Sequence, residues 1–229
     1  MIKLDSIDIL DVKTWNEFVK SLRQVKLLAD SKIHPYKDAT IETRLVNPEE
    51  VAPISRYALK GHVDIQRQLR RLFQKQSIDT LDLGDKNSDI KYVVGNERDE
   101  WLMSPPIVEE SEMDGGKAIL IDGEHRFLLA RELKQKVRVA WIRKVPRIYP
   151  PVAIPLSWKD IALHETVPTL KYKREYRYRR LEDFPDISSF SKVPVNSSNF
   201  RYFFYRDLSP VCTSGIRPVG SNSKPQIKP

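Results

Sequence analysis

The chain has 229 residues, of which 39 are Lys or Arg and 31 are Asp or Glu, so its formal net charge is +8. One cysteine excludes an internal disulfide framework, and no apolar run is long enough to span a membrane. The N-terminus has early acidic residues and no long apolar core, so we expect no signal peptide and a cytoplasmic protein. The positive balance favours a phosphate-rich partner: a nucleotide, a nucleic acid or an anionic surface.

The first 40 residues are predicted to form a helical extension. Residues 12–29 repeat apolar side chains at helical spacing, which gives the segment one apolar face. We interpret this segment as a helix that packs against the rest of the protein rather than as a partner-binding helix. Residues 31–40 contain Pro35 and are predicted to be a connector.

The next segments alternate between sheet and helix. Residues 41–46 are a predicted strand, and residues 61–76 are a predicted core helix. The polar, acidic stretch at 77–104 is interpreted as an inserted lid or specificity loop with an extra strand at 92–94. Its aspartates lack the spacing of a calcium loop, and we expect them to be solvated: Asp79, Asp82, Asp85 and Asp89.

The chain is organised around residues 117–141. A short apolar strand at 118–121 is broken by an Asp-Gly pair, a helix is predicted directly afterwards at 124–133, and a second strand follows at 137–142. A helix that begins directly after a strand presents unpaired backbone amides and the positive end of its dipole. Its start therefore attracts anions, phosphate above all.

The start of this helix carries side chains that suit phosphate chemistry. Asp122 is able to cap the helix or hold a metal ion, and Gly123 lets a ligand approach the backbone. Arg126 offers a forked donor that matches phosphate geometry. Glu124 and His125 add a proton carrier or a metal ligand.

The DGEHR sequence at 122–126, with an alanine four residues after the arginine, resembles the phosphate-binding motif of the ParB and sulfiredoxin superfamily. The ParB-type GERR box is matched at Gly123, Glu124, Arg126 and Ala130. The DGHHR-like form of the free-serine kinases is matched at Asp122, Gly123, His125 and Arg126. A Pro-Pro-Ile-Val segment at 105–108 and a turn at 114–116 precede the motif in the order typical of that family.

The resemblance implies an α/β (α+β) fold, in which a ParB/sulfiredoxin-like domain at 41–145 has a small mixed sheet and flanking helices. It further implies a bound nucleotide, either ATP, ADP or CTP, together with Mg²⁺. Sulfiredoxin activity itself is not expected, because the phosphate turn holds no cysteine.

The resemblance also assigns roles to individual side chains. The implied phosphate ligands are Gly123, His125, Arg126 and, from its place in related chains, Arg56, for which a solvated surface arginine is an equal alternative. The candidate catalytic residues are Asp122, Glu124 and His125, and Asp122 is the candidate metal ligand. None of the glutamates near residue 45 is assigned as the family's catalytic base.

Four prolines within residues 146–155 discourage helix and central strand, so the core domain is predicted to end there. A basic, aromatic extension at 146–208 and a flexible tail at 209–229 follow. The extension contains the KYKREYRYRR stretch, whose candidate nucleic-acid contacts are Lys171, Tyr172, Lys173, Arg174, Tyr176, Arg177, Arg179 and Arg180. An ordinary strand with packed tyrosines and solvated charges is the alternative.

Three functional hypotheses follow from these features. The leading hypothesis is an enzyme that hydrolyses a nucleoside triphosphate or transfers its phosphoryl group to a small hydroxylated acceptor. The second is a ParB-like DNA-binding, nuclease or partition-type factor that a nucleotide regulates. The absence of a helix-turn-helix after residue 142 and of a second ParB phosphate motif weakens it. The third is a non-catalytic interaction module in which Asp122 only caps the helix.

Overall fold

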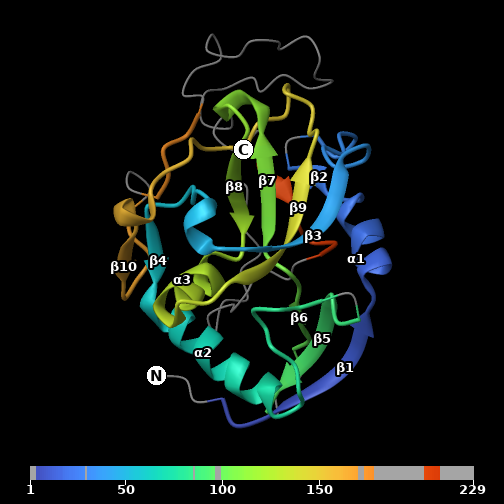
Figure 1. The fold of residues 1–229 in the computed structure, drawn as a ribbon, viewed down its shortest axis with the longest axis vertical. Helices are drawn as coiled ribbons and strands as arrows, with labels where there is room; N and C mark the ends of the chain where they lie inside the picture. Colours follow the sequence, from blue (N-terminus) through green and yellow to red (C-terminus); the bar gives the residue numbers. More distant parts are fainter. Residues whose placement is uncertain are drawn as a thin grey trace.

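The computed structural model describes residues 4–28, 30–84, 86–95, 99–169, 173–177 and 204–211. A mixed four-stranded sheet lies at its centre, in the order β3-β9-β7-β8 (Figure 1). Its strands are β3 (Thr40–Val46), β7 (Ile107–Ser111), β8 (Lys117–Asp122) and β9 (Val137–Arg143). The pair β7–β9 is parallel, and the pairs β3–β9 and β7–β8 are antiparallel. This mixed sheet with flanking helices confirms the predicted α+β class.

Both faces of the central sheet are covered by apolar side chains. On one face α3 (Glu124–Leu133) packs Phe127 and Ala130 against sheet residues such as Val139. On the other face α1 (Trp15–Leu22) packs Phe18 against Ile107 and its neighbours. The interpretation of the N-terminal helix as a packing helix is therefore confirmed.

The helix α1 is shorter than the segment predicted from apolar spacing. Thr14 caps it, because its hydroxyl accepts the Glu17 amide while the Glu17 carboxylate accepts the Thr14 amide at 2.9 Å. Residues 12 and 13 lie before the cap in β1 (Ile7–Lys13), and the chain leaves the helix for a two-residue strand, β2 (Lys26–Leu27). The apolar residues at helical spacing thus continue into residues of β1 and β2, where pairing with other strands outweighs the helical pattern.

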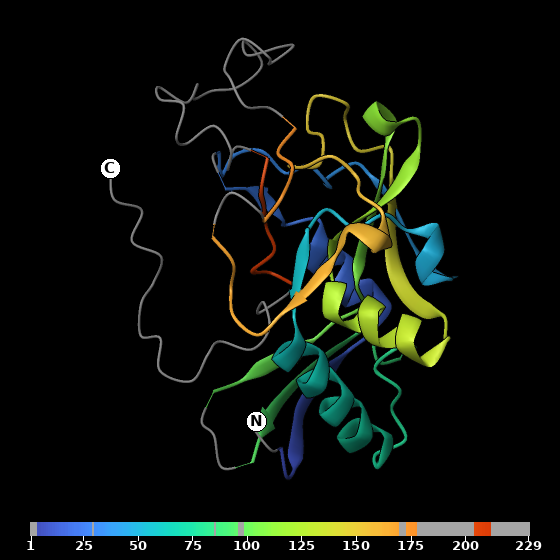
Figure 2. The same ribbon diagram turned by 90° about the vertical axis from the view of Figure 1, so that its left-hand side faces the viewer.

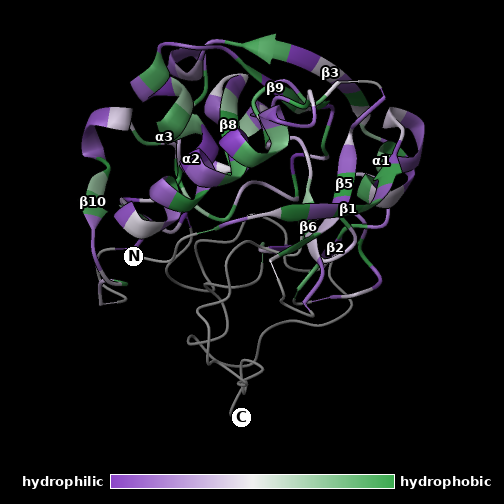
Figure 3. Cartoon of the chain, turned by 90° about the horizontal axis from the view of Figure 1, so that it is seen from below, coloured by the Kyte–Doolittle hydropathy of each residue, from purple (hydrophilic) through white to green (hydrophobic). Residues whose placement is uncertain are grey.

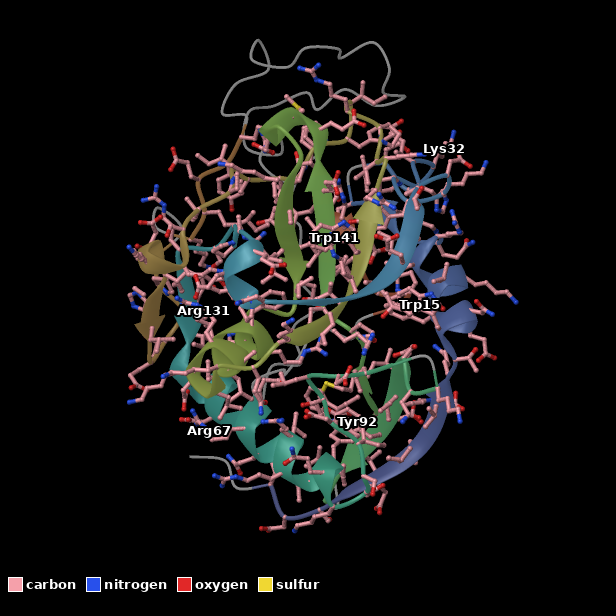
Figure 4. The ribbon with its side chains drawn as sticks, viewed as in Figure 1. Trp15, Lys32, Arg67, Tyr92, Arg131 and Trp141 are labelled. Carbon is pink, nitrogen blue, oxygen red and sulfur yellow. The ribbon has the colours of Figure 1, made fainter. Side chains whose placement is uncertain are left out.

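A second sheet, in the order β1-β5-β6, lies beside the central sheet. The stretch predicted as an insertion supplies β5 (Asp89–Val94) and β6 (Trp101–Met103), and both pairs of this sheet are antiparallel. The extra strand predicted at 92–94 is confirmed and is longer than expected. Figure 4 places Tyr92 in this second sheet and Trp141 in the central one.

The aspartates of the same stretch are paired rather than simply solvated. Asp79 binds Arg70, and Asp82 binds Arg138. Asp89 is 1% exposed and binds Lys13 across the β1–β5 pair at 2.8 Å. The expectation of solvated acids is wrong for Asp89, because a strand partner 76 positions away buries it. Asp85 lies outside the described residues.

The long helix α2 (Lys60–Gln74) connects the two sheets. It contacts α3 along one side, and Figures 1 and 2 show the two helices next to each other. Its apolar side packs on the second sheet through Leu69 and Phe73, and the ring of Phe73 lies 5.1 Å from that of Tyr92. Figure 3 shows the alternation of hydrophobic and hydrophilic residues along the helix. The predicted core helix at 61–76 is confirmed.

Several short elements complete the fold. The strand β4 (Tyr57–Leu59) leads directly into α2 and pairs in parallel with β10 (Ala162–His164). The strand β11 (Arg206–Asp207) pairs with β2. Three short 3-10 helices are η1 (Pro48–Glu50), η2 (Glu112–Asp114) and η3 (Trp158–Asp160). Within the described parts of the chain, no helix has the length and apolarity needed to cross a membrane.

The described segments after residue 145 pack on the core. The indole of Trp158 donates to the carbonyls of Pro48 and Val51, at 2.9 and 2.7 Å, and stacks on Phe127. Phe204 is buried in an apolar cluster with Ile119. The predicted tail is described only as far as residue 211.

Candidate functional site

The turn between β8 and α3 is shaped by a glycine. Gly123 is the N-cap of α3 and has φ 97°, a conformation that side chains with a Cβ rarely adopt. A Cβ atom at this position would lie 2.5 Å from the Cβ of Pro106. Both constraints require glycine here. The N-cap residue of α3 therefore has no side chain.

The start of α3 carries no side-chain cap among the described residues. Gly123, not Asp122, occupies the N-cap position, so the hypothesis that Asp122 caps the helix is wrong. Of the first backbone amides, those of Arg126 and Phe127 bond to the Gly123 carbonyl at 3.0 and 3.1 Å. Anion binding at this helix start stays a prediction from the sequence.

This turn opens into a cavity of about 560 Å³. A polar wall is formed by Ser55, Asp122, Gly123, Glu124, His125, Arg126, Lys173 and Arg174. An apolar wall is formed by Leu4, Ile65, Leu69, Tyr92, Val94, Trp101, Leu102 and Met103. The first set comes mainly from the β8–α3 turn and the second from α2 and the second sheet. The cavity thus lies between the two sheets and has the size of a small-molecule site.

A family model described as the ParB CE domain matches residues 17–162. The chain belongs to the ParB CE domain family. The match begins in α1, includes the whole central sheet and the DGEHR turn, and ends at the first residue of β10. Searches of curated proteins and of solved structures found no match. The ParB-like domain predicted from the motif is therefore confirmed.

Glu124 is a buried carboxyl with a raised pKa in this ParB CE domain. Burial raises the pKa of its carboxyl from 4.5 to about 7, with the nearby Arg174 opposing the shift and the Asp122 carboxylate adding to it. Its Oε1 atom is shielded from solvent and has no hydrogen-bond partner within the described residues. A carboxyl with a pKa near 7 can accept or donate a proton at neutral pH.

His125 is neutral at the same pH. Burial, together with the neighbouring His62, lowers its pKa from 6.5 to about 4. Its Nε2 atom accepts the backbone amide of Leu59 at 3.4 Å, and its ring lies 4.9 Å from that of His62. An acceptor at Nε2 places the proton of the neutral ring on Nδ1. His125 therefore joins the turn to the start of α2, and its ring is uncharged at neutral pH.

The cations of the cavity come from two distant segments. Arg126 is 6% exposed and lies on α3, one turn from the cavity's glycine. Arg174 lies over the ring of Tyr205 at 5.0 Å and acts electrostatically on Glu124. Lys173 also lines the cavity. Positive charge from both segments favours an anionic ligand beside the turn.

The basic stretch predicted for nucleic-acid contact has a different environment in the structure. Its residues Lys173, Arg174 and Tyr176 line the cavity. Arg177 forms a mostly buried ion pair with Asp114. The remaining candidates lie outside the described residues: Lys171, Tyr172, Arg179 and Arg180. Three of the four described candidates thus line the cavity, and the fourth is held in an ion pair.

Arg56 lies apart from the turn. Its guanidinium pairs with Glu175 and is 45% exposed, and Arg56 does not line the cavity. Its backbone amide bonds to the carbonyl of Lys173, which attaches the basic segment to the chain before β4. In this conformation Arg56 positions the Lys173–Arg174 segment.

No cluster of three or more His, Cys, Asp or Glu side chains with metal-binding geometry occurs in the described ranges. Magnesium bound with a nucleotide does not require such a cluster, because it uses one or two carboxylates together with phosphate oxygens and water. Asp122 lines the cavity at the end of β8, and its role as a metal ligand stays a prediction.

Several residues of the cavity were not identified by sequence reasoning. His62, Gln66 and Trp101 carry no motif, and their spacing matches a core helix and a loop. Arg174 was identified, but as a nucleic-acid contact. The available signal was the pairing of charged and aromatic residues in that basic stretch, which is also typical of a nucleotide site.

Proposed function

We propose that this ParB CE domain binds a nucleoside triphosphate or diphosphate through the Asp122–Arg126 turn and transfers or hydrolyses the terminal phosphoryl group. The observation that supports this most directly is the uncapped start of α3, which opens into a cavity lined by Arg126, Arg174 and Glu124. Backbone amides, cations and a titratable carboxyl are the groups that phosphoryl transfer requires.

The phosphate-binding step rests on the polar wall. Glycine at 123 lets phosphate oxygens approach the first amides of α3 without a Cβ in the way. Arg126 and Arg174 both line the cavity and contribute positive charge to it, and guanidinium groups bind phosphate through two parallel donors. Asp122 would hold the Mg²⁺ ion that accompanies the phosphates.

The chemical step assigns proton transfer to Glu124. Its carboxylate accepts the proton of a water molecule or of an acceptor hydroxyl as the oxygen attacks the terminal phosphorus. The new phosphorus–oxygen bond forms while the bond to the bridging oxygen breaks. The nucleotide leaves with the electron pair, as a diphosphate from a triphosphate substrate or as a monophosphate from a diphosphate. The elevated pKa of Glu124 suits this role at neutral pH.

The nucleic-acid hypothesis is not favoured by the described residues. Lys173 and Arg174 line the cavity, and Arg177 is paired with Asp114, so these three cations are not presented together on an open surface. Their placement supports nucleotide binding instead.

The proposal is tested by thermal unfolding and isothermal calorimetry with ATP, ADP and CTP, each with Mg²⁺. A ligand at 100 times its Kd stabilises the native state by about 2.7 kcal/mol, so at least one nucleotide should raise the Tm of the wild type. Arg126→Lys keeps the positive charge but loses the two parallel donors of the guanidinium. We expect it to weaken nucleotide binding by about tenfold or more. Arg147→Ala, which removes an exposed arginine, is the matched control and should bind as the wild type does. Absence of a Tm shift and of binding heat with all three nucleotides would refute the proposal.

Hydrolysis and transfer are separated by following the labelled terminal phosphate. Release as inorganic phosphate in buffer alone identifies water as the acceptor. Transfer to added L-serine, the probe suggested by the kinase-like motif, identifies a small hydroxylated acceptor.

A further inference from the structure

The apolar wall of the cavity is not explained by phosphate binding. Phosphates need donors and cations, whereas this wall presents side chains such as Ile65 and Leu69 from α2 and Tyr92, Val94 and Met103 from the second sheet. Desolvation of this surface would stabilise a ligand that also has an apolar part. The cavity therefore fits a molecule with one anionic end and one apolar end.

Two residues that line the cavity, Gln66 and Trp101, each carry a buried polar atom. Gln66 Oε1 and Trp101 Nε1 are shielded from solvent, and within the described parts of the chain neither has a hydrogen-bond partner. One is an acceptor and the other is a donor only. An unsatisfied buried polar atom is destabilising, and most such atoms in folded proteins find a partner. Two such atoms on residues that line one cavity indicate that a ligand supplies their hydrogen-bond partners.

We infer that the apolar wall holds the heteroaromatic base of the bound nucleotide, with Gln66 and Trp101 recognising its edge. This inference rests on the nucleotide binding proposed above. A nucleobase has apolar faces and an edge that carries both donors and acceptors, which matches one apolar wall with one free acceptor and one free donor. An aliphatic ligand would leave both polar atoms unsatisfied.

The place of Trp101 connects the two ends of such a ligand. Trp101 lines the 560 Å³ cavity and also an adjoining cavity of about 680 Å³, and Asp122, Arg174 and Tyr205 are common to both. The indole thus lies at the boundary between the two cavities, and Asp122 and Arg174 of the polar wall lie there too. A base beside Trp101 leaves its phosphates within reach of the turn.

The apolar wall and the Asp122–Arg126 turn come from different segments of the chain, so the wall is able to select the base independently of the phosphates. Its tryptophan and methionine lie in β6, and Tyr92 and Val94 lie in β5, both of which come from the stretch 77–104. The phosphate turn lies on a different element and uses different residues. Substitutions in the apolar wall should consequently change base recognition without changing phosphate binding.

The test compares nucleotides with inorganic triphosphate by isothermal calorimetry, with Mg²⁺ and the full chain. We expect the wild type to bind ATP or CTP at least tenfold more tightly than inorganic triphosphate, since only the nucleotides reach the apolar wall. Gln66→Met keeps the side-chain volume approximately, Trp101→Phe keeps an aromatic ring, and each loses the polar atom. Each should weaken nucleotide binding by about three- to tenfold and leave triphosphate binding unchanged. Arg126→Lys should weaken the binding of both the nucleotide and inorganic triphosphate.

The outcomes separate this inference from the function on which it rests. Equal affinity of the wild type for nucleotide and triphosphate would overturn the base assignment and leave phosphate binding standing. Binding of neither ligand would overturn the proposed function and the base assignment with it. The wild-type comparison needs no substitution, so a variant that fails to fold does not prevent the test. A second wild-type readout is tryptophan fluorescence, which a base beside Trp101 should quench and inorganic triphosphate should not.

Discussion

The guanidinium of Arg206 lies 3.0 Å from both carboxylate oxygens of Glu109, and neither side chain is more than 2% exposed. Glu109 belongs to the central strand β7, and Arg206 belongs to β11 near the end of the described chain. Tyr36 donates to the same carboxylate at 3.0 Å. This buried pair fastens the C-terminal segment, which includes the cavity residue Tyr205, to the core.

Arg206→Met should destabilise the protein strongly, because it leaves the Glu109 carboxylate buried without its cation. Loss of one partner of a buried ion pair costs about 3–5 kcal/mol. The measurement is urea unfolding followed by circular dichroism. The double variant Arg206→Met, Glu109→Leu should recover most of the loss, and a single variant as stable as the wild type would contradict the assignment.

Gly123→Ala should destabilise the protein by more than about 1 kcal/mol, because the residue must keep a positive φ and its new Cβ would meet Pro106. Gly61→Ala is the matched control. It lies in α2 with open space where a Cβ would point and no positive φ, so it should be neutral or stabilising by roughly 0.5–1 kcal/mol. Equal effects of the two substitutions on the free energy of unfolding would contradict the role of the turn.

Glu124→Gln should change the pH dependence of stability. The pKa of Glu124 is raised from 4.5 to about 7, so between these values the folded state binds more protons than the unfolded state. The contribution of Glu124 to the free energy of unfolding is then fully present below pH 4.5 and is lost as the pH rises through 7. Above pH 7 we expect Glu124→Gln to be more stable than the wild type. Parallel stability curves for the two proteins from pH 4 to 8 would show that the carboxyl is not perturbed.

His125→Gln should show the opposite sign. The pKa of His125 is lowered from 6.5 to about 4, so between these values the unfolded state binds more protons. The stability associated with the neutral ring is present above pH 6.5 and is lost as the pH falls towards 4. Relative to the wild type, His125→Gln should therefore lose less stability between pH 6.5 and 4. The check is the difference between the two unfolding curves across that range.

Glu124→Gln should also abolish most of the proposed phosphoryl transfer. A positioned general base contributes roughly 10²–10⁴-fold to rate, so release of labelled phosphate should fall by at least about 10²-fold while nucleotide affinity changes little. The wild-type rate should rise with pH through about 7 and then level off as the carboxyl ionises. A variant with the wild-type rate would remove Glu124 from the mechanism.

The sequence by itself determined the Asp122–Arg126 turn and the elements next to it. An apolar strand, an Asp-Gly break and a helix starting at Glu124 are local features, because the backbone needs glycine at the turn and the helix follows its own period. The long helix α2 and the strand at 137–142 were predictable for the same reason. Their periodicity is strong and uninterrupted.

Only the tertiary structure decided the cavity and the second sheet. Gln66, Trp101 and Arg174 come together from α2, β6 and the basic segment, and no spacing in the sequence predicts that meeting. Residues 12 and 13 belong to a strand because β5 pairs with them, and Asp89 is buried because β1 covers it. Contacts between residues about 75 positions apart depend on packing of the whole chain, which outweighs local propensity.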